Sequence, residues 1–261
     1  TWLGAISNNY VQTAGTNMLS GTATITQTAT VNGGLFDLAG KTYSNGLMVV
    51  GGTGVLTNSV ANATFNGGLS NAATVFLSQN TFFNGAVTNT GAFTWLGAIS
   101  NSYVQTAGTN TLLGAGTITQ TATVNGGLFD LNGQTYSNGL MVVSGTGALT
   151  SSVANATFNG GLSNAATFFS SAPVFFNGIV TNTGGFFFNG SVVSNNFVNS
   201  AAGTVTLNNT ATITRTATVN GGTFNLNGQT YTNGLMIVSG SGVLTNNVGG
   251  ATFNGGLSNA A

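Results

Sequence analysis

A block of 93 residues recurs along this chain and constrains its fold more than any other feature. The segment Thr24–Leu38 returns with the same residue types at Thr117–Leu131, and again with three substitutions at Thr212–Leu226. Self-similarity at a fixed spacing is typical of folds in which one structural unit stacks on the next. We therefore divide the chain into three repeat units, residues 1–93, 94–188 and an incomplete 189–261, and expect them to form one continuous fold.

A second segment confirms this spacing. Ala63–Ala73 recurs without change at Ala156–Ala166 and Ala251–Ala261. The last shift is 95 residues rather than 93, because a short insertion occupies the region around residues 186–202. Such agreement indicates recent duplication of a structural unit. Since the chain starts at the edge of one repeat and stops inside another, we expect it to be a segment of a longer protein or a mature fragment.

Each repeat reads as a series of short β-strands. Runs rich in Val, Ile, Thr, Phe and Tyr are separated by Asn-Gly and Gly-Gly pairs, which are turn signals. Helix signals are nearly absent, and Pro173 is the only proline. Short, evenly spaced strands fit a sandwich, a barrel or a solenoid, but long repeats favour the solenoid, because its coils stack without limit whereas a sandwich closes.

The predicted fold is therefore all-β, a parallel β-helix (β-solenoid). Coils of about 18 to 22 residues give about five coils in each repeat unit and about 13 to 14 in all. We expect the following residues and their copies to point inward: Val31, Leu35, Leu38, Leu47, Val49, Leu56, Phe65 and Leu69. The predicted corner residues are Asn32, Gly33, Asn66, Gly67, Asn125, Gly126, Asn159, Gly160, Asn220, Gly221, Asn254 and Gly255. Corner asparagines, including Asn84 and Asn177, are expected to form amide ladders from coil to coil.

Charge is almost absent from this sequence. Of 261 residues only Asp37, Lys41, Asp130 and Arg215 are charged, and there is no His, Cys or Glu. Soluble domains are usually about a quarter charged. Two cations are too few to neutralise a run of phosphates, so we expect no nucleic-acid partner. No apolar run approaches the roughly 18 residues of a membrane span.

The same composition argues against catalysis. Acid–base chemistry needs two titratable groups beside one substrate, but Asp37 and Asp130 are copies of one position, which Asn225 occupies in the third repeat. We interpret this position as a structural turn or strand residue. Metal sites need clusters of His, Cys or carboxylates. We expect no enzyme activity, no metal and no cofactor.

Two features favour surface contacts. Thr24, Thr26, Thr28 and Thr30 alternate and should share one strand face, which makes ice binding a remote alternative. Adjacent aromatic residues should place one ring of each pair outside, unless a corner buries both. The candidate contact aromatics are Trp2, Trp95, Phe82, Phe175 and Phe187, with stacking inside the coil as the alternative.

The sequence resembles the β-helical passenger regions of bacterial autotransporter and filamentous-haemagglutinin-like surface adhesins. The resemblance rests on Asn-, Gly- and Thr-rich coils such as those at residues 30–38, 56–60 and 87–91. It implies export to the bacterial cell surface and an extracellular, structural or adhesive role.

From these features we expect a non-catalytic structural protein. The first hypothesis is a self-assembling filament subunit that contacts itself head to tail through coils without polar caps. The alternative is a stalk or passenger segment of a larger autotransporter-type adhesin, with neighbouring segments of a longer chain or surface glycans as partners.

Overall fold

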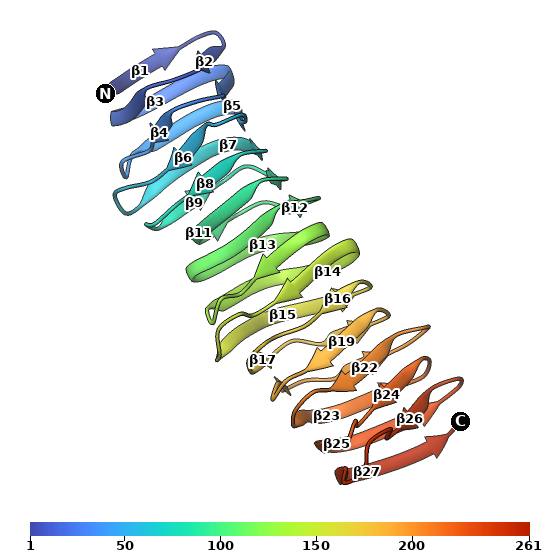
Figure 1. Cartoon of the computed structure of the whole chain (residues 1–261). Helices are drawn as coiled ribbons and strands as arrows, with labels where there is room; N and C mark the ends of the chain where they lie inside the picture. The colour runs from blue at the N-terminus through green and yellow to red at the C-terminus, as the bar shows by residue number, and fades with distance from the viewer. The chain divides into compact units, whose positions relative to one another are not determined.

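The computed structural model describes all 261 residues, and its regular elements are β-strands without any helix. Strand pairing is parallel throughout, and the strands stack as a β-solenoid of about 14 turns, which confirms the predicted fold (Figure 1). The chain divides into two compact units, unit 1 (Thr1–Leu128) and unit 2 (Phe129–Ala261). The repeat boundary between residues 93 and 94 lies inside unit 1, because β10 pairs with β12 and β11 with β13 across it.

Unit 1 begins with β1 (Trp2–Ile6), β2 (Tyr10–Gln12), β3 (Thr16–Val31), β4 (Leu35–Asp37), β5 (Thr42–Val50) and β6 (Val55–Thr57). It continues with β7 (Ala63–Asn71), β8 (Thr74–Phe76), β9 (Thr81–Phe83), β10 (Val87–Asn89), β11 (Ala92–Ile99) and β12 (Tyr103–Gln105). The next strand, β13 (Thr109–Asp130), extends past the division at residue 128.

Unit 2 continues with β14 (Thr135–Thr150), β15 (Ala156–Asn164), β16 (Thr167–Phe168), β17 (Val174–Phe176), β18 (Val180–Asn182), β19 (Gly185–Phe188) and β20 (Val192–Val193). Its remaining strands are β21 (Phe197–Asn199), β22 (Thr204–Leu207), β23 (Ala211–Val219), β24 (Thr223–Asn225), β25 (Thr230–Ser239), β26 (Val243–Thr245) and β27 (Thr252–Ala260).

Each coil contributes one strand segment to each of three faces. In unit 1, successive coils place residues 42–43, 64–65 and 82–83 on face A, residues 48–50, 69–71 and 87–89 on face B, and residues 55–57, 74–76 and 92–94 on face C. Coil length varies around the predicted value. Phe83 pairs with Ile99, 16 residues later, whereas Tyr43 pairs with Phe65, 22 residues later.

Alternation along each strand fills the coil with apolar side chains. In unit 1, Phe36, Tyr43, Phe65 and Phe83 are fully buried, and consecutive ring centroids lie 5.2–5.4 Å apart. Tilted and edge-on contacts at this spacing are favourable for aromatic rings. Unit 2 repeats the arrangement, with 5.2 Å between Tyr136 and Phe158. Stacked aromatic and aliphatic columns therefore form the core of each unit.

The predicted inward set was correct for Val31, Leu38, Leu56, Phe65 and Leu69, which are all buried. It was wrong for Leu47, whose side chain is 39 % exposed, and for Leu35 and Val49, which are half-buried. The neighbours Phe36, Met48 and Val50 point inward instead. The physical reason at Leu47 is a bulge, because the pairing register shifts between Ser44 and Leu47 and reverses the expected alternation.

Glycines let neighbouring corners approach closely. Gly67 has a φ of 140°, and a Cβ there would lie 2.2 Å from the backbone oxygen of Asn45 in the preceding coil. Gly34 has a φ of 74°, and its Cβ would lie 2.0 Å from the oxygen of Gly15. Both positions combine a left-handed backbone with a contact that only glycine permits. This explains the Asn-Gly-Gly signals at the predicted corners.

Candidate functional site at the open coils

Amide side chains form two kinds of ladder within the units. The predicted corner ladder is present at Asn66 and Asn84, where Nδ2 of Asn84 donates to Oδ1 of Asn66 at 2.5 Å. Its copy joins Asn177 to Asn159 at 2.6 Å. Both ladders are short and solvent-exposed, and each continues only to a serine, Ser44 or Ser137.

A second ladder lies inside face B, and sequence reasoning missed it. Asn71 is 1 % exposed, and its Nδ2 donates at 2.8 Å both to Oδ1 of Asn89 and to the backbone oxygen of Ala92. In unit 2, Nδ2 of Asn164 donates to Asn182, and Nδ2 of Asn182 donates to Asn199, both at 2.8 Å. Buried amides paired in this way fix the register of successive coils. The available signal was the Asn that ends each Leu-Ser-Asn and Val-Thr-Asn segment.

The two carboxylates serve as turn caps. In unit 1, Asp37 accepts hydrogen bonds from the backbone nitrogens of Ala39 and Ser59 and, at 2.6 Å, from the hydroxyl of Ser59. Asp130 makes the same contacts in unit 2 with Asn132 and Ser152.

In the third repeat, Oδ1 of Asn225 accepts from the backbone nitrogens of Asn227 and Asn247. The amide oxygen of Asn225 therefore accepts from the counterparts of the backbone nitrogens that donate to the two carboxylates. This contact pattern supports the structural interpretation of the position.

The candidate contact aromatics divide into exposed and buried residues. Phe82 and Phe175 are 38 % and 37 % exposed, while their neighbours Phe83 and Phe176 are buried, as alternation predicted. Phe187 is half-buried. Trp95 contradicts the expectation of a surface contact, because it is fully buried and donates its indole N–H to Asn110 at 2.9 Å.

The threonine array lies along a single strand. Residues Thr24 to Thr30 belong to β3, and the next coil places Ser44 beside Thr24, Leu47 beside Thr28 and Val49 beside Thr30. A flat face that binds the ice lattice needs the same residue type on successive coils. Here the threonines follow a single coil around a corner, and the next coil does not repeat them.

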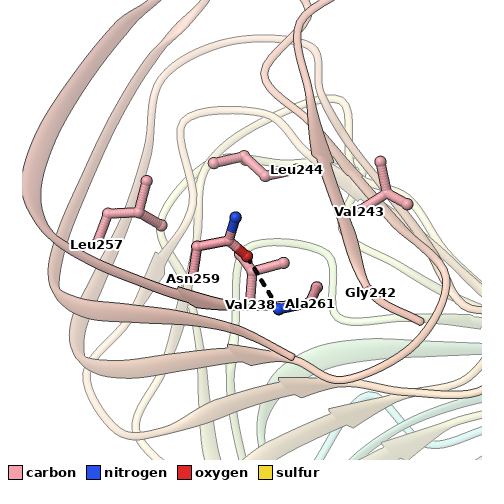
Figure 2. A pocket seen from close by; sticks show the side chains of 7 residues that line it. All are labelled: Val238, Gly242, Val243, Leu244, Leu257, Asn259 and Ala261. Carbon is pink, nitrogen blue, oxygen red and sulfur yellow. Dashed lines mark hydrogen bonds between the residues drawn. The ribbon is translucent and has the colours of Figure 1, made fainter. Parts of the chain in front are cut away.

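The last coil of unit 2 exposes side chains that earlier coils bury. Leu257 is 52 % exposed, whereas its counterparts Leu69 and Leu162 are each 1 % exposed. A cavity of about 370 Å³ opens over this coil, lined by Val238, Val243, Leu244, Leu257 and Asn259 among others (Figure 2). The cavity is mainly apolar, and its clearest polar group is the Asn259 side chain, whose Oδ1 accepts from the backbone nitrogen of Ala261 at 3.2 Å.

The first coil of unit 1 is uncovered in the same way. Trp2, Ile6 and Tyr10 are half-buried, whereas their counterparts one repeat later, Trp95, Ile99 and Tyr103, are fully buried. Trp2 stacks on Tyr10 with a centroid distance of 6.1 Å. The first coil of unit 1 and the last coil of unit 2 therefore each present core side chains and one strand edge without a partner in this chain.

Burial raises the pKa values of Tyr43, Tyr103 and Tyr231 above the ordinary value of tyrosine, because an ionised phenolate would lose its solvation in the core. The neighbouring amide side chains of Asn110 and Asn89 lower the pKa of Tyr103 and partly oppose this effect. These tyrosines line the core and carry no charge at neutral pH.

No group of three or more His, Cys, Asp or Glu side chains lies close enough together to hold a metal ion. The fold contains no helix that is long and apolar enough to cross a membrane. Comparison with protein-family models, curated proteins and solved structures finds no match to this chain.

Proposed function

We propose that this chain is a non-catalytic structural protein of the bacterial cell surface, a β-solenoid subunit that assembles end to end into an extracellular filament. The observation that carries the proposal is the parallel β-solenoid, in which each coil pairs with the next through its strand edges, as Gly97–Ile99, the copy of Gly4–Ile6, pairs with β9. Leu257 is 52 % exposed, and a coil of a second copy would cover it as Leu69 and Leu162 are covered. The resemblance to adhesin passenger regions supports the surface location.

The segments of the first coil have copies that are covered within unit 1. The first coil offers Gly4–Ile6 and Tyr10–Gln12, which repeat as Gly97–Ile99 and Tyr103–Gln105. Inside unit 1, these later segments pair in parallel with β9 and β10. The first coil of a second copy would thus bring to the last coil side chains that already pack against other coils within this protein.

Charge does not oppose this contact. Neither the first coil, residues 1–21, nor the last coil, residues 240–261, contains a charged side chain. Apolar surface buried between copies would contribute roughly 25 cal/mol for each Å² removed from water. Backbone groups on both strand edges would pair along the solenoid axis.

The test is a dilution series of the purified chain by sedimentation velocity, with negative-stain electron microscopy of the same samples. We expect association that increases with concentration and filaments with a uniform width. Leu257→Lys places a charge in the contact and should abolish association. Val153→Lys is the matched control, because Val153 is similarly exposed but lies on the flank, and it should assemble normally. A wild-type chain that stays monomeric at high concentration would overturn the proposal.

A second candidate is a stalk segment of a larger adhesin that binds surface glycans. Phe76 and Phe82 are exposed at either end of the loop between β8 and β9, and Phe169 and Phe175 recur one repeat later. Aromatic rings beside amide side chains such as Gln79 suit sugar rings and hydroxyl groups. Glycan-array binding that is lost in Phe82→Ala, in a chain that does not assemble, would favour this candidate.

A further inference from the structure

We propose that unit 2 carries a binding site for an extended, neutral polysaccharide, which stacks its pyranose rings on the side chains of Phe169 and Phe187. This site, the aromatic platform, lies on β19 and directly after β16, with β14 and β22 as the neighbouring strands of the same face (Figure 1). The inference goes beyond filament assembly and rests on the second candidate function, because it names a site and a class of glycan for it.

Strand register brings the two rings together on adjacent coils. The parallel pairing of β16 with β19 places Phe169 beside Phe187. In the first repeat the corresponding residues, Phe76 and Thr94, are direct partners. Adjacent coils are separated by about 4.8 Å, which is close to the length of one pyranose unit in an extended chain. Two consecutive sugars of a chain that runs from coil to coil can therefore each meet one ring.

Both rings present surface to the solvent. The side chain of Phe169 is 42 % exposed, and that of Phe187 is half-buried. Phe187 leans over Gly185, because a Cβ added to this glycine would lie 3.3 Å from Cε2 of the ring. The ring therefore lies along the sheet and turns one face outward. The negative face of an aromatic ring attracts the C–H groups on the apolar side of a pyranose.

Buried aromatic residues hold the platform in place from inside the coil. Phe168 and Phe186 are fully buried, and their ring centroids lie 4.4 Å apart. Phe188, the next inward residue on β19, contacts Phe186 at 4.8 Å. Because this packing fixes the backbone that carries both exposed rings, little additional ordering is needed when a ligand binds.

Hydroxyl groups border the platform, and charge is absent from it. Thr167 and Thr204 pair with Gly185 from either side, and Thr206 pairs with Phe187. Threonine hydroxyls both donate and accept hydrogen bonds, as the hydroxyls of a sugar do. Residues 131–214 contain no charged side chain. The platform therefore offers no cation to the carboxylate or sulfate of an acidic polysaccharide, and this favours a neutral one.

The probes are three hexasaccharides: cellohexaose, which is neutral and extended, maltohexaose, which is neutral and coiled, and hexagalacturonate, which is acidic. Isothermal titration calorimetry measures their binding to the complete 261-residue chain. We expect cellohexaose to bind, the other two to bind at least tenfold more weakly, and Phe187→Thr to weaken cellohexaose binding at least fivefold. Since the first repeat has Thr94 at this position, the variant should fold, which circular dichroism checks. Phe169→Thr is the second variant and should have the same effect.

Unit 1 supplies the matched controls. Phe76→Ala should bind cellohexaose as the wild type does, because Phe76 has Thr94 and not a second ring beside it. The double variant Ala92→Gly with Thr94→Phe gives unit 1 the residues that unit 2 has at positions 185 and 187. It should therefore add a second binding site of similar affinity.

No binding of cellohexaose to a folded chain, equal binding of hexagalacturonate, or equal binding by Phe187→Thr would overturn the inference. Binding that Phe82→Ala removes and Phe187→Thr retains would contradict the platform and leave the second candidate function in place. Self-association that Phe187→Thr abolishes, without cellohexaose binding, would show that a second copy covers the rings and would also overturn the inference. End-to-end assembly is tested separately by Leu257→Lys, so that failure of one proposal is distinguishable from failure of the other.

Discussion

The segments Ala63–Ala73 and Ala251–Ala261 have the same eleven residues but different environments. In the first, Phe65, Leu69 and Asn71 are buried beneath the strands of the next coil. In the second, Leu257 and Asn259 are exposed, because no further coil pairs with β27. Whether a residue in a solenoid is buried therefore depends on the neighbouring coil as much as on the residue itself. Each substitution in Ala63–Ala73 can be compared with the same substitution in Ala251–Ala261.

The largest expected difference is at the phenylalanine. Phe65→Ala should destabilise the chain by about 3–5 kcal/mol, because it removes a buried ring between Tyr43 and Phe83 and leaves a cavity. Phe253→Ala should cost less than about half as much, since Phe253 is half-exposed and has a ring neighbour on one side only, Tyr231. Urea unfolding followed by circular dichroism measures both, and equal losses would contradict the comparison.

The amide ladder gives the next largest difference. Asn71→Leu should cost about 2–3 kcal/mol, because Ala73 N–H and the acceptors on the next coil lose a buried partner. Asn259→Leu should change the stability of the monomer by less than about 0.5 kcal/mol, as surface substitutions usually do. Thermal unfolding of the two variants, at a concentration without association, tests the prediction. A large loss at Asn259 would mean that the ladder does not depend on the next coil.

Alkaline pH should weaken the covered coils through their buried tyrosines. Burial raises the pKa of Tyr103 in the folded chain, so above pH 10 the unfolded chain loses the proton first and stability decreases with increasing pH. Each such tyrosine contributes about 1.4 kcal/mol per pH unit between its unfolded and folded pKa. Tyr103→Phe should reduce the slope of stability against pH by this amount above pH 10 and not below it. An unchanged slope in urea unfolding between pH 10 and 11.5 would contradict the assignment.

The smallest effect is expected at the turn cap that differs between repeats. Asp37→Asn should cost less than about 1 kcal/mol, because Asn225 already accepts from two backbone nitrogens at the same position. Asp37→Leu is the contrast and should cost about 1–3 kcal/mol, since the N–H groups of Ala39 and Ser59 would lose their acceptor. A loss in Asp37→Asn as large as that in Asp37→Leu would show that the charge itself is needed.

Particular residues show which structural features the sequence predicted and which it did not. The repeat spacing and the Asn-Gly corners predicted a parallel solenoid and the exposure of one ring in the pairs Phe82-Phe83 and Phe175-Phe176. The alternation rule failed at Leu47, where a bulge reverses the alternation. Trp95 was also a predicted contact aromatic, but an acceptor at Asn110, fifteen residues away, lets the indole be buried.

Periodicity and turn residues are local properties, and they were sufficient to predict the fold class and the approximate coil length. The contacts of Asp37 and Asp130, the buried ladder of Asn71 and Asn89 and the exposure of one copy of Leu69 depend on residues in adjacent coils, and they became known from the three-dimensional fold. The physical reason is that a solenoid residue has its main neighbours about 16 to 22 residues away, in the adjacent coils. Identical segments such as Ala63–Ala73 and Ala251–Ala261 therefore acquire different properties from what lies next to them.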